Sequence, residues 1–262
     1  RYWIAEHHNM RSIASSATQL LIQHTLANTK KIRVGSGGVM LPNHSPYLIA
    51  EQYGTLEILY PNRVDLGLGR APGTDVPTAM ALRRTKDLKT DFERDLAELS
   101  GYFKGSNYVQ AYPAHGLYLP FYILGSSTDS AYLAAKLGLP YSFAAHFAPT
   151  MMENAIAIYN RYFQPSAILD KPYVILGVNA ILADTDEEAK RLSTTMIQSF
   201  LNIVTSNQKG LMPPLQSEEA VWREFIATNK VPHFGPIAFE IDDLISHEKE
   251  IVEKMTKASF IG

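Results

Sequence analysis

The 262-residue sequence contains no cysteine, no long uninterrupted apolar run and no excess of basic residues. The lack of cysteine excludes disulfide bonds and thiolate metal sites, and it favours a reducing compartment, so we expect a cytoplasmic protein. No apolar run approaches the roughly 18 residues that a membrane-spanning helix needs, so no membrane partner is expected. The formal net charge of −2 provides no basic excess for binding nucleic acid.

The composition is that of a globular protein, with 46% hydrophobic and 19% charged residues. The length would suit two average domains or one α/β barrel, because such barrels run to about 250 residues. Apolar, β-rich runs alternate with longer helical segments. Their nearly continuous apolar character is typical of strands that are covered on both faces. We predict six strands, at Tyr2–Glu6, Ile32–Leu41, Val64–Arg70, Phe121–Gly125, Tyr141–Ala145 and Tyr173–Ala183. A short run beside prolines, Tyr108–Ala111, is a possible seventh strand.

Helices are predicted between the strands, several of them from capping signals. Serine followed by proline is a helix start at Ser45-Pro46, and the stretch from Thr185 to Glu188 forms a capping box. The predicted helices are Ser12–Thr29, Pro46 to Tyr60, Phe92–Phe103, Thr128–Leu137, Met151–Phe163, Thr185 to about Thr205, Ser217–Asn229 and Ile241–Lys257.

Repeated βα units predict a parallel sheet, either open or closed into a barrel. A closed (β/α)8 barrel needs eight strands, and six are found here. We therefore expect a single TIM-type barrel domain over residues 1–262, with the first βα unit and the last strand and helix absent from this sequence. The proline-rich stretch 208–236 reads as a loop-rich insertion, either a lid or a disordered excursion.

Polar residues follow several predicted strands, and in parallel barrels chemistry gathers at those strand ends. In the stretch Glu6-His7-His8, Glu6 and His8 share one face of the strand and His7 takes the other. A histidine there could act as a general base, or could simply be hydrogen-bonded at a strand end. No third ligand of suitable spacing accompanies the pair, so no metal site is predicted.

Arg70 follows the glycine-rich strand "DLGLG", whose glycines do not have the spacing of a dinucleotide fingerprint. It could hold a phosphate or form a structural salt bridge. In "LGSSTDS", a strand end leads through three hydroxyl residues into a helix, and a helix N-terminus with added hydroxyls can bind phosphate. Ordinary serine capping is the alternative. The glycines of "GSGGVML" mark a bulge, a strained peptide or the close approach of a flat ligand.

These motifs occur in long strings that resemble one family over nearly the whole chain. The strings are "AEHHN", "RVGSGGVMLPNHSPYLIAEQYGTLEILYPNRVDLGLGRAPGTD", "ILGSSTDSAYLAAKLGLPYSFAAHFAP" and "ADTDEEA". They resemble the bacterial-luciferase-like monooxygenases, flavin-dependent barrel oxidoreductases, and especially the small single-component bacterial members.

The resemblance implies roles for particular residues. His7 matches a catalytic-site histidine, and Gly37-Gly38 matches a pair that carries a non-prolyl cis peptide bond beside the flavin. Luciferase has a glutamate where Ser126 stands, so this position departs from the pattern. The residues that the resemblance assigns to the flavin are Gly37, Gly38, Arg70, Ser126, Ser127 and Ser130. We also consider His146, at the end of "YSFAAH", for substrate contact.

The resemblance implies a monooxygenase that uses reduced FMN and O2 to oxidise a small organic substrate. Two alternatives remain open: hydride transfer with the deazaflavin F420, and a flavin-binding protein without turnover. The resemblance also implies a homodimer, for which the small residues 14–17 of the first predicted helix would allow close approach. Since no nicotinamide motif is visible, a separate reductase would supply the reduced flavin.

Overall fold

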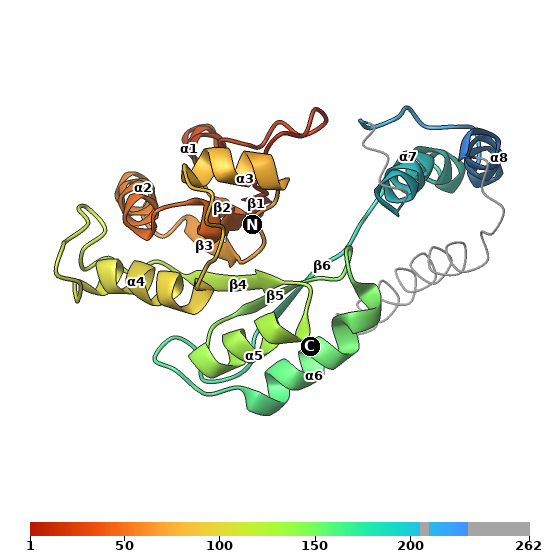
Figure 1. Cartoon of the computed structure of the whole chain (residues 1–262). Coiled ribbons are helices and arrows are strands. Elements are labelled where there is room, and N and C mark those ends of the chain that lie inside the picture. Colours follow the sequence, from red (N-terminus) through yellow and green to blue (C-terminus); the bar gives the residue numbers. More distant parts are fainter. Residues whose placement is uncertain (205–209, 230–262) are drawn as a thin grey trace. The chain divides into compact units, whose positions relative to one another are not determined.

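The computed structural model describes residues 1–204 and 210–229 (Figure 1). The chain divides into two compact units, Arg1–Gly177 and Val178–Gly262, and each is described by itself. The single barrel domain predicted over residues 1–262 stays a prediction. The predicted helix Ile241–Lys257 lies outside the described residues, as do parts of the 208–236 insertion.

The first unit is built on one sheet of six parallel strands in sequential order. The strands are β1 (Tyr2–Ile4), β2 (Val34–Met40), β3 (Val64–Gly69), β4 (Phe121–Gly125), β5 (Tyr141–Ala144) and β6 (Val174–Gly177). All six predicted strands are confirmed, most of them in shorter form, whereas Tyr108–Ala111 forms no strand. Parallel strands in sequential order follow one another as they do around a TIM-type barrel, which agrees with the predicted α/β class.

The central strand β3 explains why the sequence shows no polar–apolar alternation there. Every residue of β3 is buried. The exception to its apolar character is Asp65, whose fully buried carboxylate accepts hydrogen bonds from Trp3 Nε1 at 3.0 Å and from Arg33 at 2.6 Å. The polar residue is therefore paired where it is buried, as a charge inside a sheet must be.

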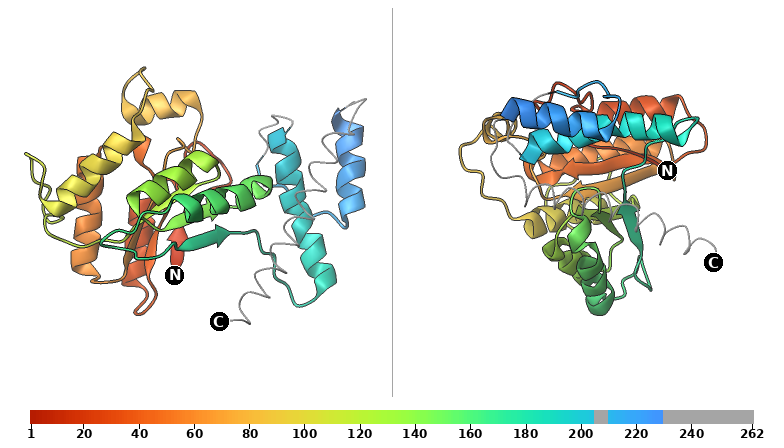
Figure 2. Two further views of the ribbon diagram at one scale, coloured as in Figure 1. Left: turned by 90° about the horizontal axis from the view of Figure 1, so that it is seen from below. Right: turned by 90° about the vertical axis from the view of Figure 1, so that its right-hand side faces the viewer.

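Helices connect the strands of the first unit. They are α1 (Thr18–Ala27), α2 (Pro46–Leu59), α3 (Val76–Arg83), α4 (Phe92–Lys104), α5 (Thr128–Leu137) and α6 (Met152–Tyr162), with short 3-10 turns η1 (Leu41–Asn43) and η2 (Pro149–Met151). Helix α5 packs beside α6, and α2 packs beside α4, as Figures 1 and 2 show. The helices that pack against each other are therefore close in the sequence: α5 and α6 are consecutive, and α2 and α4 are separated only by α3.

Helix α1 begins six residues later than predicted, and the small residues 14–17 lie before it rather than on it. The reason is local hydrogen bonding, because serine and threonine compete with helix formation by bonding to nearby backbone groups. The Ser15 carbonyl accepts from the Thr18 hydroxyl at 3.1 Å and from the His7 amide at 3.4 Å. These contacts hold the segment against the exit of β1.

Helix α3 was not predicted, although the sequence carries its start signal. The Asp75 carboxylate accepts the Thr78 amide at 2.9 Å and so caps the helix, and Pro77 occupies its first turn.

The second unit contains helices α7 (Asp186–Val204) and α8 (Glu218–Asn229) in its described part. The predicted cap is confirmed, since the Glu188 amide donates to the Thr185 hydroxyl at 3.2 Å. The two helices pack through a small apolar cluster of Ile197, Leu201, Val221 and Phe225. In the described parts of both units, no helix combines the length and apolar character needed to cross a membrane.

The close approach of β2 and β3 yields a stability prediction. A Cβ added at Gly67 would lie 2.2 Å from the Ser36 carbonyl oxygen, a backbone atom that cannot move aside alone. We expect Gly67→Ala to lower the free energy of unfolding by about 1–3 kcal/mol, measured by urea denaturation. Gly69→Ala in the same strand is the control, because its Cβ would first meet the flexible Met40 sulfur at 3.0 Å. Equal losses in the two variants would contradict the steric argument.

Candidate active site at the carboxyl edge of the sheet

The candidate site lies where the six parallel strands end. Because all of them run in the same direction, the segments that follow them lie along one edge of the sheet. Glu6 to His8 follow β1, Arg70 follows β3, Ser126 follows β4 and His146 follows β5. The structure thus places every segment carrying a predicted site residue at, or just before, this edge.

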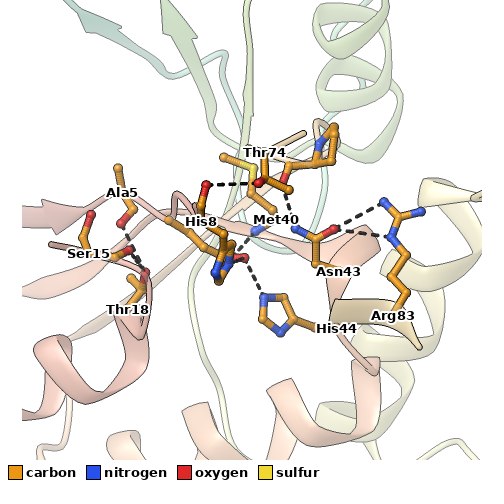
Figure 3. A network of polar contacts seen from close by, with 11 residues as sticks. Ala5, His8, Ser15, Thr18, Met40, Asn43, His44, Thr74 and Arg83 are labelled. Carbon is orange, nitrogen blue, oxygen red and sulfur yellow. Dashed lines mark hydrogen bonds and ion pairs between the residues drawn. The ribbon is translucent and has the colours of Figure 1, made fainter. Parts of the chain in front are cut away.

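Glu6 is the most constrained residue at this edge. Its fully buried carboxylate pairs through Oε1 with His8 Nε2 at 3.0 Å and with His44 Nε2 at 2.8 Å. Figure 3 labels the partners His8, His44 and Met40. Its Oε2 accepts the Met40 amide at 3.1 Å. Burial alone would raise the pKa of Glu6, but the hydrogen bonds from His44, His8 and Met40 outweigh it and lower the pKa below the ordinary value.

The ionised carboxylate of Glu6 determines which ring nitrogen of His8 and of His44 donates a proton to it. An ionised carboxylate only accepts hydrogen bonds, so both imidazoles must present Nε2–H to it. Glu6 and His8 contact each other, as predicted for side chains that point the same way, although both residues lie beyond the end of β1 rather than on the strand. The same carboxylate joins the exit of β1 to the end of β2 and to His44, which lies two residues before the start of α2.

His7 differs from its neighbours because its side chain is not used in this way. Its backbone amide donates to the Ser15 carbonyl, while its Nδ1 atom is buried with no hydrogen-bond partner in the described part of the chain. A buried polar atom without a partner carries a desolvation penalty that a bound group can relieve. Among His7, His8, His44 and His146, His7 is the one whose ring makes no hydrogen bond to the described residues.

The Gly37-Gly38 peptide bond is cis, as the resemblance implied. The β2–β3 register shifts between Ser36 and Val39, so the bond lies at a bulge. A Cβ at Gly38 would lie 2.9 Å from the Gly67 carbonyl oxygen, and one at Gly37 would lie 3.1 Å from Trp3 Cβ. The backbone at this point therefore carries no side chain and packs closely against β1 and β3, with Gly37 half-buried and Gly38 buried.

Arg70 and the start of α5 are brought together by the fold. The Arg70 guanidinium lies 3.5 Å from the Asp129 carboxylate in the first turn of α5. Ser127 is the N-cap residue, but its side chain makes no capping hydrogen bond. The amide groups of this helix start therefore lack the usual hydroxyl cap and are available to an anion.

The serines of this turn have different surroundings. Ser126 is exposed, whereas the Ser130 hydroxyl donates to the Ser127 carbonyl at 2.7 Å and lies 2.9 Å from the Tyr141 hydroxyl. Burial raises the pKa of Tyr141 to about 12, so it keeps its proton and donates to Ser127 at 3.1 Å. The Ser130 hydroxyl therefore stabilises the turn through its contacts with Ser127 and Tyr141. Its predicted contact with a flavin stays a prediction.

His146 is tied to the neighbouring strand end. Its backbone amide and its Nδ1 both lie near the Gly177 carbonyl oxygen, at 3.0 and 3.1 Å. Its ring packs against Phe147, with centroids 4.1 Å apart. The ring is thereby held at the same edge, and its predicted substrate contact stays a prediction.

Sequence reasoning missed His44, Asn43 and Arg83. Asn43 is buried and donates to the Pro72 carbonyl at 2.7 Å, while Arg83 Nε donates to its side-chain oxygen at 3.3 Å (Figure 3). The string "LPNH" after a glycine-rich strand was the available signal. It did not show that the histidine would turn back to a carboxylate 38 residues earlier.

Within residues 1–204 and 210–229, no group of three or more His, Asp or Glu side chains is arranged to hold a metal ion. The nearest arrangement in composition, Glu6 with His8 and His44, is occupied by its own hydrogen bonds. Both imidazoles point Nε2 at one carboxylate oxygen rather than at a shared external point.

Comparisons with known proteins place this geometry in context. The family model described as luciferase-like monooxygenase matches residues 1–233. The chain is 53% identical to the uncharacterized protein YvbT of Bacillus subtilis, over 86% of this chain and 68% of that protein. It is 51% identical to a luciferase-like monooxygenase of Escherichia coli, over 85% of this chain and 68% of that protein. It is 40% identical to the N-acetyl-S-alkylcysteine monooxygenase of B. subtilis, over 99% of this chain and 78% of that protein.

Solved structures share the fold. The crystal structure of apo-MsnO8 superposes with a TM-score of 0.77 at 34% identity, over 91% of this chain and 69% of that one. The oxygenating constituent of 3,6-diketocamphane monooxygenase from Pseudomonas putida, solved with FMN, gives a TM-score of 0.59 at 19% identity, over 78% of this chain and 64% of that one. An F420-dependent secondary alcohol dehydrogenase gives a TM-score of 0.57 at 15% identity, over 95% of this chain and 80% of that one. The last two support the fold alone.

The Glu6 contacts predict how stability depends on pH. A carboxyl group whose pKa is lowered by folding stabilises the folded state above its unfolded pKa, and this contribution is lost as the pH falls through the folded value. We expect Glu6→Gln to lower the free energy of unfolding by about 1–3 kcal/mol near neutrality, with a smaller difference at acidic pH once the lowered pKa of Glu6 is passed and its carboxyl group is protonated. Urea denaturation across pH would measure both effects.

Glu57→Gln is the matched control, because burial raises the pKa of Glu57 and so reverses the sign. Its ionised form is disfavoured in the fold, so this variant should lose no comparable stability near neutrality. A loss for Glu6→Gln that is the same at every pH would contradict the ionised assignment.

Proposed function

Because the chain belongs to the luciferase-like monooxygenase family, we propose that it uses reduced FMN and O2 to oxidise a small organic substrate. The observation that carries the proposal is the meeting of Arg70 with the first turn of α5. These residues are 59 positions apart in the sequence, and folding brings a guanidinium within 3.5 Å of the first turn of α5. An arginine beside free helix amides is a suitable site for a phosphate.

The residues present fit FMN at this edge of the sheet. Arg70, the amides at the start of α5 and the hydroxyls of Ser126 and Ser127 would hold the phosphate. The bare backbone of Gly37-Gly38 would lie against the flavin ring. When bound, the flavin supplies the activation of O2, and the protein supplies binding, orientation and exclusion of water.

We assign proton transfer to His7. Its buried Nδ1 has no partner among the described residues, and its neighbour Glu6 anchors the chain on either side of it. An imidazole can gain and lose a proton near neutrality, as a general acid–base group must. Holding the β1 exit in place keeps this ring in a constant position relative to the strand ends.

Further parts of the proposal concern partners and setting. A separate reductase would deliver reduced FMN, and two copies of the chain would form a dimer in the cytoplasm. The fold is also that of an F420-dependent dehydrogenase, so F420 is the competing ligand to test. Tight binding of F420 without binding of FMN would replace this proposal with hydride transfer, and flavin binding without any effect on its oxidation would indicate a carrier.

The phosphate assignment predicts the effect of removing Arg70. Arg70→Ala should weaken binding of FMN about tenfold and leave binding of riboflavin, which lacks the phosphate, unchanged. Quenching of flavin fluorescence would measure both dissociation constants. Arg94→Ala, which removes another exposed arginine, is the control. Equal weakening of FMN and riboflavin would place the phosphate elsewhere.

The role of His7 predicts a separation of binding from oxygen chemistry. His7→Ala should bind FMN within about twofold of the unaltered protein, because it removes no phosphate contact. Reduced FMN mixed anaerobically with the protein and then exposed to O2 in a stopped-flow instrument should reoxidise more slowly than free flavin. With His7→Ala the rate should approach that of free flavin, and the exposed His24→Ala should behave as the unaltered protein. An unchanged rate in His7→Ala would remove His7 from the mechanism.

A further inference from the structure

Asp129 occupies an unexpected place in the proposed phosphate site. It lies in the first turn of α5, two residues after the N-cap, and its carboxylate is 3.5 Å from the Arg70 guanidinium. Both side chains are exposed, Arg70 at 56% and Asp129 at 71%. The Asp129 carboxylate is thus already paired with the arginine that would bind the phosphate.

The charge of Asp129 opposes a bound phosphate in two ways. It pairs with Arg70, and it offsets the partial positive charge that the unpaired amides give to the helix start. A phosphate monoester carries about −1.5 to −2 charges at neutral pH, so it would repel a carboxylate in the same turn. Exposed ion pairs are weak, so the phosphate can displace the Arg70–Asp129 contact without a large penalty.

We propose that Asp129 determines how tightly this site holds the phosphate of its flavin, by competing with that phosphate for Arg70. The inference rests on the proposed function, because it concerns the same phosphate site. It assigns Asp129 the role of a specificity-determining residue that weakens binding. A weak hold on the phosphate suits a flavin that must arrive reduced and leave oxidised in every catalytic cycle.

The remaining polar groups of the turn do not provide this competition. The Ser130 hydroxyl is engaged by the Ser127 carbonyl and by Tyr141, and the hydroxyl of Ser126 is neutral and exposed. Among the described residues of the α5 first turn, Asp129 is the acidic one. Its removal should therefore change the electrostatics of the site without removing a predicted phosphate ligand.

The test compares FMN with riboflavin on the oxidised-flavin binding equilibrium. Asp129→Asn keeps the size of the side chain and removes its charge. We expect the dissociation constant of FMN to fall about 3- to 10-fold, and that of riboflavin to stay unchanged. The gain should shrink in about 1 M salt, because the effect is between exposed charges. Glu93→Gln is the matched control, since Glu93 forms a similarly exposed ion pair with Lys136 at the other end of α5.

The outcomes separate this inference from the proposed function. If the unaltered protein binds FMN no better than riboflavin, the phosphate site itself fails. If it prefers FMN, and Arg70→Ala abolishes that preference, the site stands. Unchanged or weaker FMN binding by Asp129→Asn would then overturn the role of Asp129 alone, and weaker binding would mean that Asp129 orients Arg70 instead. Asp129→Ser is a second variant, and equal riboflavin affinity in all variants verifies that the site remains folded.

Discussion

The buried carboxylate of Glu6 is the constraint on which the candidate site depends. An ionised group inside a protein is strongly destabilising unless it is paired and hydrogen-bonded. Here the partners are His8, His44 and the Met40 amide, which come from the exit of β1, the start of α2 and the end of β2. These segments must therefore meet at one point, and that requirement fixes the position of His7 between Glu6 and His8.

The two ends of the candidate site have opposite physical characters. The Glu6 side chain is 1% exposed and fully bonded, so the end that carries His7 is rigid. Arg70 and Asp129 are exposed and joined by one long contact, so the end that carries Arg70 can exchange partners. Between them lies the Gly37-Gly38 backbone, which packs against the flanking strands β1 and β3. In the proposed function, the rigid end would serve proton transfer, and the exchangeable end would hold the phosphate of a flavin that binds and leaves in each cycle.

Much of the sheet could be predicted from the sequence, because strands covered on both faces leave continuous apolar runs such as β3. Helix starts with a serine–proline or capping-box signal, as at α2 and α7, were also readable. The start of α1 was not, because the Ser15 carbonyl accepts the His7 amide and the Thr18 hydroxyl bonds to the Ala5 and Ser15 carbonyls, which holds the segment before α1 at the exit of β1. The site was readable as polar strand ends. The contacts of His44 with Glu6 and of Asp129 with Arg70 join residues distant in sequence, and single-sequence periodicity carries no signal for them.

The most direct measurement is a crystal structure of the protein soaked with FMN. We expect phosphate density against Arg70 and the first turn of α5, with the flavin ring extending toward Gly37-Gly38 and His7. A flavin bound away from this edge of the sheet, or a phosphate held by other residues, would contradict the account.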